Sequence, residues 1–275
     1  MAIRSLMPDY RFPTFYLSHG GGPWPFVDGR LRTKFAQLEA SLRGFSRRLG
    51  REPKAILVIS GHWEERDFSV MASPKPPMLY DFEGFPQSTY SVQYPAPGSP
   101  ALAVRVRSLI EGAGLASRLD PARGFDHGTW SMLAITHPHA DVPVIQVSIR
   151  ADFDPEAHLR LGRALAPLRD EGVVIVGSGS SYHNLTGSRN AAEASARFDE
   201  WLTETLVGAE PERRSWELSR WTDAPFARDA HPEEDHLMPL HVALGAAEHE
   251  PAQVIYHQAD FFDQWTVSSF QFGES

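Results

Sequence analysis

Three short runs of the sequence are almost entirely apolar: AILVIS (55–60), VPVIQVSI (142–149) and GVVIVGSG (172–179). Runs of this kind, rich in Val and Ile, are typical of strands covered on both faces, because a strand with one wet face alternates apolar and polar residues. Three further strand-like runs are PTFYL (13–17), FSVMA (68–72) and QVIYH (253–257). The sequence therefore calls for helices on both sides of a sheet.

Helical patterns fall between these runs. They are expected over 31–49, from Ser99-Pro100 onward, over 154–168, over 191–207 and over 236–247. Strands that alternate with helices predict an α/β fold with a mainly parallel central sheet flanked by helices. The length of 275 residues allows one large domain or two small ones. Open sheets of this type form their ligand sites at the C-terminal edge of the strands, so we expect the active site there.

The composition excludes several classes of partner. The chain carries 35 acidic and 26 basic residues, a net charge of −9, which opposes binding to nucleic acid. Its N-terminus has no apolar core of signal-peptide length, and no window approaches the roughly 20 apolar residues that cross a membrane. Cysteine is absent, so disulfides and thiolate ligands are excluded. We expect a cytoplasmic enzyme with no nucleic acid or membrane partner; the sequence leaves a homo-oligomer open.

Histidine stands out, with 12 residues in the chain. His19 follows the run PTFYL, His62 follows AILVIS, and His183 follows GVVIVGSG. The carboxyl ends of parallel strands meet at one edge of a sheet, so we expect these three side chains to gather there. In a chain without cysteine, a transition-metal site has to be built from imidazole and carboxylate.

A second histidine-rich stretch, DAHPEEDHLMPLHVALGAA, begins at residue 229. His231, His236 and His241 are five residues apart, which separates neighbours by about 140° on a helix, so they cannot share one face. Asp235 is expected to cap the helix and to place His236 in its first turn, beside the sheet edge. His241 is expected to face elsewhere.

Two irregular stretches allow more than one interpretation. In GFDHGTW (124–130), His127 either orients a bound anion or oxygen or simply caps the following helix. The segment 73–100, rich in proline and aromatic residues, fits neither strand nor helix periodicity. Long irregular loops in compact domains are often functional lids; the alternative is a surface excursion packed by its own aromatic side chains.

Neutral imidazoles around a metal with open positions permit two kinds of chemistry. Zinc in such a site activates water for hydrolysis. Ferrous iron binds a chelating substrate and dioxygen side by side. The three glycines after His19 favour the second kind, because a flat aromatic ring has to come close to the metal. A non-catalytic binding protein with a histidine-lined pocket is a third interpretation.

A series of motifs follows the same order as in one known family: FYLSHGGGP, ISGHWEE, EGFP…Y…YPAPGSP, FDHGTW, VPVIQVSI, the HNL of SYHNL and EDHLMPLHVALGAA. From about residue 13 to residue 272 the chain resembles the class III extradiol ring-cleaving dioxygenases, and more closely their DOPA 4,5-dioxygenase-like branch. The resemblance implies an α/β fold that forms a single catalytic domain over residues 1–275, with the metal at the sheet edge. It also implies non-haem Fe(II) as the catalytic metal, with Zn(II) often found in proteins of this branch.

The resemblance further implies that His19, His62 and His236 bind the metal. One departure concerns the third position, which is a glutamate in the protocatechuate-cleaving branch. This chain has His236 there, with Glu233 and Glu234 beside it, and the motif EDHLMPL favours the histidine.

The implied reaction opens the aromatic ring of a catechol-type substrate with O2 to give a semialdehyde carrying a carboxylate. The substrate chelates through both hydroxyl oxygens and loses a proton, for which His183 is the expected acceptor, unless it is a fourth ligand. His127 would help to bind oxygen or the second oxygen of the substrate. Candidate walls of the aromatic slot are Trp24, Phe26, Trp63, Tyr80 and Phe85.

Overall fold

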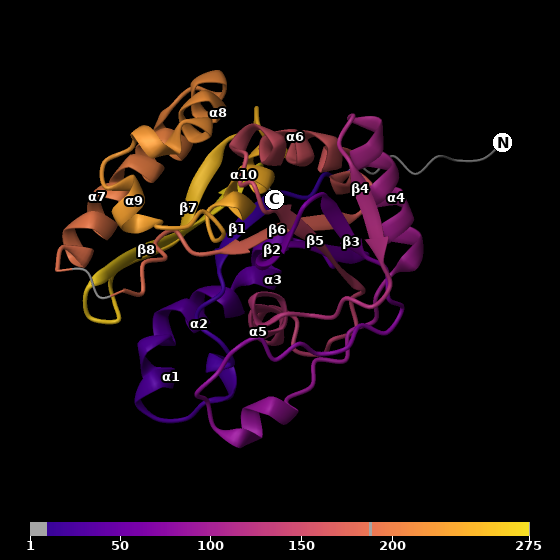
Figure 1. Cartoon of the computed structure of the whole chain (residues 1–275), viewed down its shortest axis with the longest axis horizontal. Helices are drawn as coiled ribbons and strands as arrows, with labels where there is room; N and C mark the ends of the chain where they lie inside the picture. Colours follow the sequence, from indigo (N-terminus) through magenta and orange to yellow (C-terminus); the bar gives the residue numbers. More distant parts are fainter. Residues whose placement is uncertain (1–9, 187–188, 275) are drawn as a thin grey trace.

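The structure, a computed structural model, describes residues 10–186 and 189–274. Within these residues eight strands form one sheet, in the order β4-β3-β5-β2-β6-β1-β8-β7, through the middle of the molecule (Figure 1). The strands are β1 (Thr14–Ser18), β2 (Ala55–Glu65), β3 (Phe68–Met71), β4 (Ser117–Asp120), β5 (Val144–Arg150), β6 (Val173–Gly179), β7 (Ala252–Phe261) and β8 (Trp265–Phe272). The α-helices are α1 (Arg30–Lys34), α2 (Ala36–Arg43), α3 (Phe45–Leu49), α4 (Pro100–Gly112), α5 (His127–Thr136), α6 (Pro155–Leu165), α7 (Ala191–Thr203), α8 (Pro211–Ser219), α9 (Ala227–Ala230) and α10 (Met238–Gly245).

The central strands confirm the predicted parallel sheet. Strands β5, β2, β6 and β1 are parallel neighbours, and β3 pairs in parallel with β4. Antiparallel pairing is confined to the flanks, where β8 joins β1, β7 joins β8, and β3 meets β5. The apolar runs of β2, β5 and β6 are buried throughout their central residues, as strands with helices on both faces should be.

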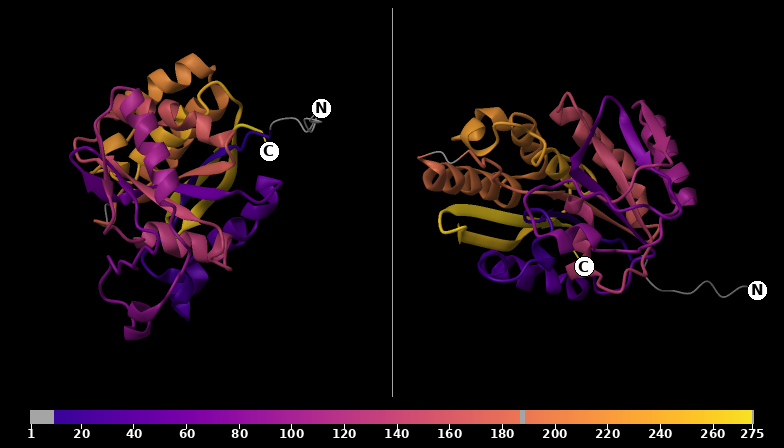
Figure 2. Two further views of the ribbon diagram at one scale, coloured as in Figure 1. Left: turned by 90° about the vertical axis from the view of Figure 1, so that its right-hand side faces the viewer. Right: turned by 60° about the horizontal axis from the view of Figure 1, so that its bottom comes forward.

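Helices cover both faces of the sheet, which gives three layers (Figures 1 and 2). Helix α10 packs on β6 and β1 and against α6, while α4 lies beside α6 on the same face. Helix α5 packs on β2 from the opposite face, together with α2. Helix α7 packs on β8. None of the described helices is both long and apolar enough to cross a membrane.

Helix boundaries depart from expectation in two places. The pattern over 31–49 is divided into α1, α2 and α3, with Gly44 between the last two. The last predicted helix, over 236–247, begins two residues late, because Pro239 takes a first-turn position where its missing N–H costs nothing. His236 therefore lies in the loop before α10 and Asp235 does not cap that helix, so both of these expectations were wrong.

Strand β2 is longer than the sequence indicates. It continues to Glu65, and its register against β5 shifts between Ser60 and Glu64. Such a bulge bends a strand and redirects a side chain. His62 lies in this bulge, inside the strand, so the expectation that it follows the strand end was wrong.

Candidate active site

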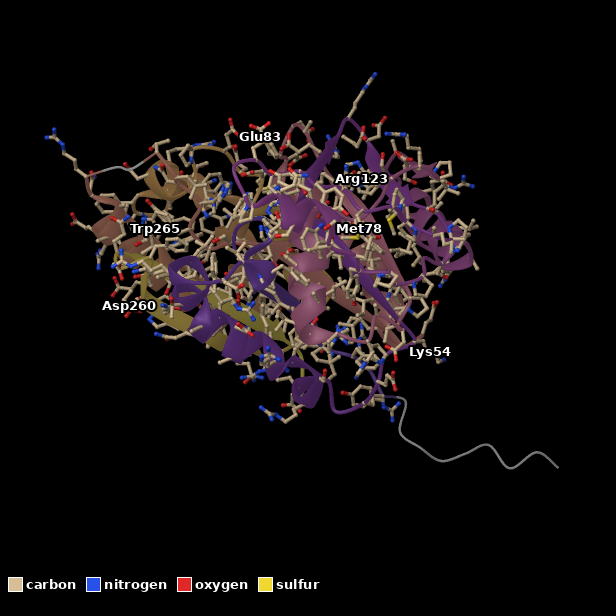
Figure 3. The ribbon with its side chains drawn as sticks, turned by 90° about the horizontal axis from the view of Figure 1, so that it is seen from below. Lys54, Met78, Glu83, Arg123, Asp260 and Trp265 are labelled. Carbon is tan, nitrogen blue, oxygen red and sulfur yellow. The ribbon has the colours of Figure 1, made fainter. Side chains whose placement is uncertain are left out.

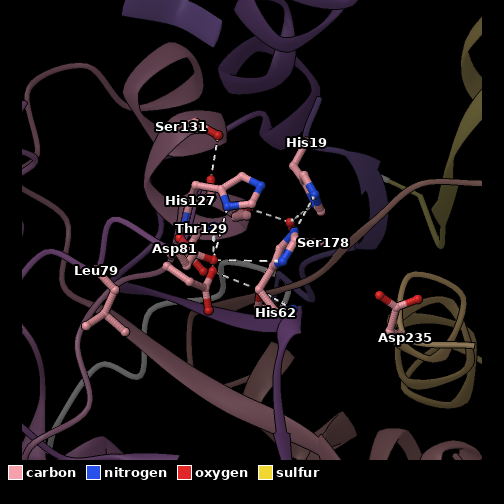
Figure 4. Close-up of polar contacts among 12 residues, drawn as sticks. His19, His62, Leu79, Asp81, His127, Thr129, Ser131, Ser178 and Asp235 are labelled. Atoms are coloured by element: carbon pink, nitrogen blue, oxygen red, sulfur yellow. Dashed lines mark hydrogen bonds and ion pairs between the residues drawn. The ribbon is translucent and has the colours of Figure 1, made fainter. Parts of the chain in front are cut away.

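Five histidines meet at the C-terminal edge of the parallel strands. His19 follows β1, His62 lies in the bulge of β2, His127 is the first residue of α5, His183 lies in the loop after β6, and His236 precedes α10. Figure 4 shows the first three turned toward one another. The sequence thus predicted the residues that converge, although two of them arrive from positions that differ from the predicted ones.

The rings are close enough to share one small ligand. The Nε2 atoms of His19 and His62 are 3.0 Å apart. The ring centre of His236 lies 4.7 Å from that of His62 and 5.1 Å from that of His19, and His183 stacks on His236 at 3.4 Å. Ligand atoms of His19, His62 and His127 all lie within 4.8 Å of one another, and the same holds for a second group of residues, His183, Asp235 and His236.

Hydrogen bonds determine which nitrogen of two of these rings carries the proton. The Ser178 hydroxyl donates to the carbonyl of Gly128, so its oxygen accepts a hydrogen bond from His19 Nδ1 at 2.9 Å. His236 Nδ1 donates to Asp235 Oδ2 at 2.7 Å. With the proton on Nδ1, both rings keep Nε2 unprotonated, which is the arrangement that a hydrogen-bond partner on the other ring nitrogen imposes on metal-binding histidines.

Burial keeps the central rings neutral. It lowers the pKa of His19 and of His236 well below the usual value, and the neighbouring imidazoles lower both further. Burial and the nearby His127 lower the pKa of His62 to about 4. A metal binds the neutral form of imidazole, so the cluster is ready to bind one near neutral pH. Imidazole donors suit iron and zinc alike.

Asp81 is a site residue that the sequence reasoning missed. Its Oδ1 accepts the backbone N–H of His127 at 2.9 Å, and its Oδ2 lies 3.0 Å from His127 Nδ1 and 3.8 Å from His62 Nδ1. Burial alone would raise the pKa of this carboxyl, but the hydrogen bonds with His127 lower it. Asp81 belongs to the irregular segment 73–100, where no local pattern marks it, because its partner is 46 residues away.

The turn before α5 is fixed by Asp126 rather than by His127. The Asp126 carboxylate caps the helix through the N–H of Thr129 and also accepts the Ser60 hydroxyl at 2.8 Å and Arg123 at 2.8 Å. It therefore ties the start of the β2 bulge to the start of α5. His127 is left free of a capping role.

Asp235 and the strands beneath it position the other two histidines. Its Oδ1 lies 3.7 Å from His183 Nδ1, so one carboxylate faces both His183 and His236. Burial alone would raise its pKa, yet these two histidines hold it well below the usual range. From β1, the Tyr16 hydroxyl donates to the His236 carbonyl at 2.8 Å. A Cβ on Gly179 would lie 2.0 Å from that same carbonyl oxygen, so only glycine lets the loop lie against β6.

Aromatic rings pack against the glycines that follow His19. Gly20 and Gly22 both have positive φ, which favours glycine. A Cβ on Gly20 would lie 2.4 Å from the Trp24 indole nitrogen, and a Cβ on Gly22 would lie 2.8 Å from the Phe85 ring. All three glycines still line the cavity beside the histidines. These glycines therefore let the aromatic rings pack closely, and they also leave room for a substrate in the cavity.

A cavity of about 410 Å³ opens in front of the histidines. Of the aromatic candidates, Phe85 lines it. Trp24 is buried behind the wall, where it stacks on Phe35 and donates to the His19 carbonyl. Trp63 packs under Arg123 instead.

The other two candidates also lie outside the cavity wall. The Tyr80 hydroxyl donates to the carbonyl of Val92, and Phe26 packs against Trp130. Much of the apolar wall comes from the hairpin of β7 and β8, through Phe261, Phe262 and Trp265, the last of which is labelled in Figure 3. Sequence reasoning missed this contribution, because these three aromatic residues lie outside the motifs that carried the prediction.

The remaining acidic and histidine candidates stay out of the cluster. Glu234 pairs with Arg228, and Glu233 is exposed. His231 and His241 are buried, each within hydrogen-bonding distance of backbone carbonyls. The segment 73–100 is packed partly by its own rings, including Phe82, and it also supplies Asp81 and Phe85.

Comparisons with known proteins agree with this arrangement. Residues 13–269 match the family described as the catalytic LigB subunit of aromatic ring-opening dioxygenase. The chain is 42% identical to a 4,5-DOPA dioxygenase extradiol of Beta vulgaris, over 90% of this chain and 91% of that protein. It is 37% identical to the protein of the same name from Escherichia coli K12, over 88% of this chain and 87% of that protein.

A solved structure shows the same fold. The crystal structure of an uncharacterized protein from Escherichia coli K12 matches with a TM-score of 0.76 at 31% identity, over 96% of this chain and all of that one. These matches favour ring opening over the zinc hydrolase and the binding protein considered from the sequence. The chain belongs to the LigB family of extradiol aromatic ring-opening dioxygenases, and its histidine cluster is compatible with a metal site.

Proposed function

We propose that the chain uses Fe(II), held by His19, His62 and His236, to open the ring of a catechol-type substrate with O2. The observation that carries the proposal is the proton placement on His19 and His236. Both rings hold their proton on Nδ1, against Ser178 and Asp235, and so keep Nε2 free beside the cavity. When bound, iron would supply the redox chemistry that joins dioxygen to the ring.

The chain's own residues then move the proton and orient the substrate. His183 is half-buried beside His236, lines the cavity and faces Asp235, so it can take the proton that a catechol hydroxyl loses on binding. His127 lines the same cavity with its Nδ1 directed to Asp81, which leaves Nε2 for an oxygen atom of the substrate or of O2. The apolar walls limit the access of water to these groups.

His127 is the competing candidate for the third ligand. Its ligand atom lies within 4.8 Å of those of His19 and His62. We assign the position to His236 because Asp235 and Tyr16 fix its ring and its backbone.

We also propose that residues 1–275 act as one catalytic domain in the cytoplasm, where a chain without cysteine needs no oxidising compartment.

Anaerobic reconstitution tests the proposal. Metal-free protein is loaded with Fe(II) or with Zn(II), and then mixed with oxygen and a panel of catechols that includes DOPA. We expect oxygen uptake and a coloured ring-opened product with the iron form only. Turnover by the zinc form, or cleavage of esters or amides without oxygen uptake, would contradict the proposal. His139→Ala, which removes an exposed histidine, serves as the matched control and should behave like the wild type.

A further inference from the structure

The cavity has two chemically distinct parts. The histidines form its base, and apolar side chains form its walls: Leu31, Phe35, Phe85, Phe261, Phe262 and Trp265. Its volume of about 410 Å³ is more than twice the roughly 150 Å³ that accommodates a benzene ring in an apolar protein cavity. A catechol chelated at the base therefore leaves apolar space unfilled.

The cavity offers no side chain of fixed opposite charge to a charged substituent. Among the described residues that line it there is no Lys, Arg, Asp or Glu, and the metal and the reacting oxygens require the five histidines. The other polar groups of the lining, which include the unpartnered Tyr182 hydroxyl and Trp265 indole N–H, are neutral. The carboxylates nearest to the base, Asp81 and Asp235, are held behind the histidines and add negative charge there.

Cations near the walls are paired elsewhere. Lys34, between the wall residues Leu31 and Phe35, pairs with Asp263. Arg32 makes a two-pronged pair with Glu39. Arg123 is bound to Asp126 and lies toward the other side of the molecule from Trp265 in Figure 3. None of these three side chains lines the cavity.

We infer that the site takes catechols with an uncharged apolar substituent, large enough to include a second ring, and discriminates against catechols with an amino acid or carboxylate substituent. An apolar group on these walls gains burial and ring contacts. A carboxylate there loses water and meets only neutral donors such as Tyr182 and Trp265 in place of a cation, which leaves its charge unpaired and is costly. This inference rests on the proposed function, and it separates this chain from relatives that are named for DOPA.

A panel of four catechols, which share one ring and differ at the end of a short side chain, tests the inference. The iron-loaded enzyme is assayed by oxygen uptake with 4-propylcatechol, dopamine, 3-(3,4-dihydroxyphenyl)propanoate and DOPA. We expect kcat/KM for 4-propylcatechol to exceed that for the propanoate and for DOPA at least about tenfold, because one methylene in an apolar pocket can already change specificity by about 10-fold or more. Equal or faster turnover of either carboxylate would overturn the inference. Absence of oxygen uptake with all four catechols, and with every other catechol tested, would instead refute the proposed function.

A variant at the mouth of the cavity tests whether the missing cation causes the discrimination against carboxylates. Leu185 lines the cavity while 69% of it is exposed, so Leu185→Arg places a cation at the mouth without burying it. We expect the ratio of kcat/KM for the propanoate to that for 4-propylcatechol to rise about tenfold, one decade being about 1.4 kcal/mol. Leu185→Gln is the uncharged control and should leave the ratio unchanged. An unchanged ratio in Leu185→Arg, with an unaltered melting temperature, would show that the missing cation is not the cause.

Discussion

Two groups of buried histidines differ in what their ring nitrogens meet. At the start of α6, His158 Nδ1 donates to the Asp154 carbonyl at 2.7 Å and its Nε2 accepts the Arg150 N–H at 3.1 Å. His19 has one nitrogen on Ser178, while its Nε2 faces another histidine. Burial lowers the pKa in both cases. Burial alone therefore does not mark a site; a group of imidazoles whose ring nitrogens face one another does.

The largest expected effect separates the two groups by metal content. His236→Ala should abolish iron binding at equimolar metal. It should lower kcat/KM by more than about 100-fold, the upper end of what loss of a residue that only hydrogen-bonds to a metal ligand costs. His158→Gln should keep its iron, since that ring has no free nitrogen. Metal analysis after gel filtration measures this. Full iron content in His236→Ala, together with its loss in His127→Ala, would move the third ligand to His127.

The next effect distinguishes a ligand from a proton acceptor. His183→Ala should retain iron but lose about 10²- to 10⁴-fold in kcat, the usual contribution of a general acid or base. Single-turnover oxygen uptake with measured iron occupancy gives both quantities. Loss of the metal itself would make His183 a fourth ligand.

A smaller effect is expected for a residue that acts only through the histidines. Asp235→Asn keeps the shape but removes the charge that faces His236 and His183. We expect iron affinity or activity to fall about 10- to 100-fold. Glu234→Gln is the matched control, since the neighbouring carboxylate pairs with Arg228 instead and should be dispensable. If Glu234→Gln lost the metal and Asp235→Asn kept it, the third ligand would be a glutamate after all.

The smallest effect concerns stability rather than activity. Burial lowers the pKa of His158 to about 4 in the folded chain, against about 6.5 when unfolded. The unfolded chain therefore binds the proton first as the pH falls, and stability is lost between about pH 6.5 and pH 4. At about pH 5 this loss amounts to about 2 kcal/mol.

Urea unfolding of the metal-free protein at about pH 7 and about pH 5 measures this loss. His158→Gln should lose about 2 kcal/mol less than the wild type over that interval, because an amide does not titrate. An identical loss in the variant and the wild type would show that His158 is not the group responsible.

Much of the fold follows from sequence patterns that depend on burial. The runs in β2, β5 and β6 are apolar because both of their faces are covered, so the parallel sheet could be predicted. Strand β8 could not, because its Ser268, Ser269 and Gln271 are polar yet buried. The Ser268 N–H donates to the Ser181 hydroxyl, and the Ser269 hydroxyl accepts the Ser18 N–H. Local periodicity does not reveal such contacts between residues distant in the sequence.

The candidate site likewise has parts that the sequence predicts and parts that it does not. Histidines at strand ends could be assigned because parallel strands bring their carboxyl ends to one edge. The bulge around His62 depends on pairing with β5, and Asp81 depends on a contact with His127 across 46 residues. The walls from β7 and β8 likewise depend on how the last hairpin folds over the cavity. The class of reaction was therefore predictable from the sequence, whereas most of the residues that form the cavity walls were not.

The central claim is that His19, His62 and His236 together hold the catalytic iron. An anomalous difference map, recorded at the iron edge from crystals loaded with Fe(II) without oxygen, tests it most directly. We predict one peak within coordinating distance of the Nε2 atoms of all three residues. A peak bound by His19, His62 and His127 instead, or no peak among the five histidines of a protein that turns over catechol, would contradict it.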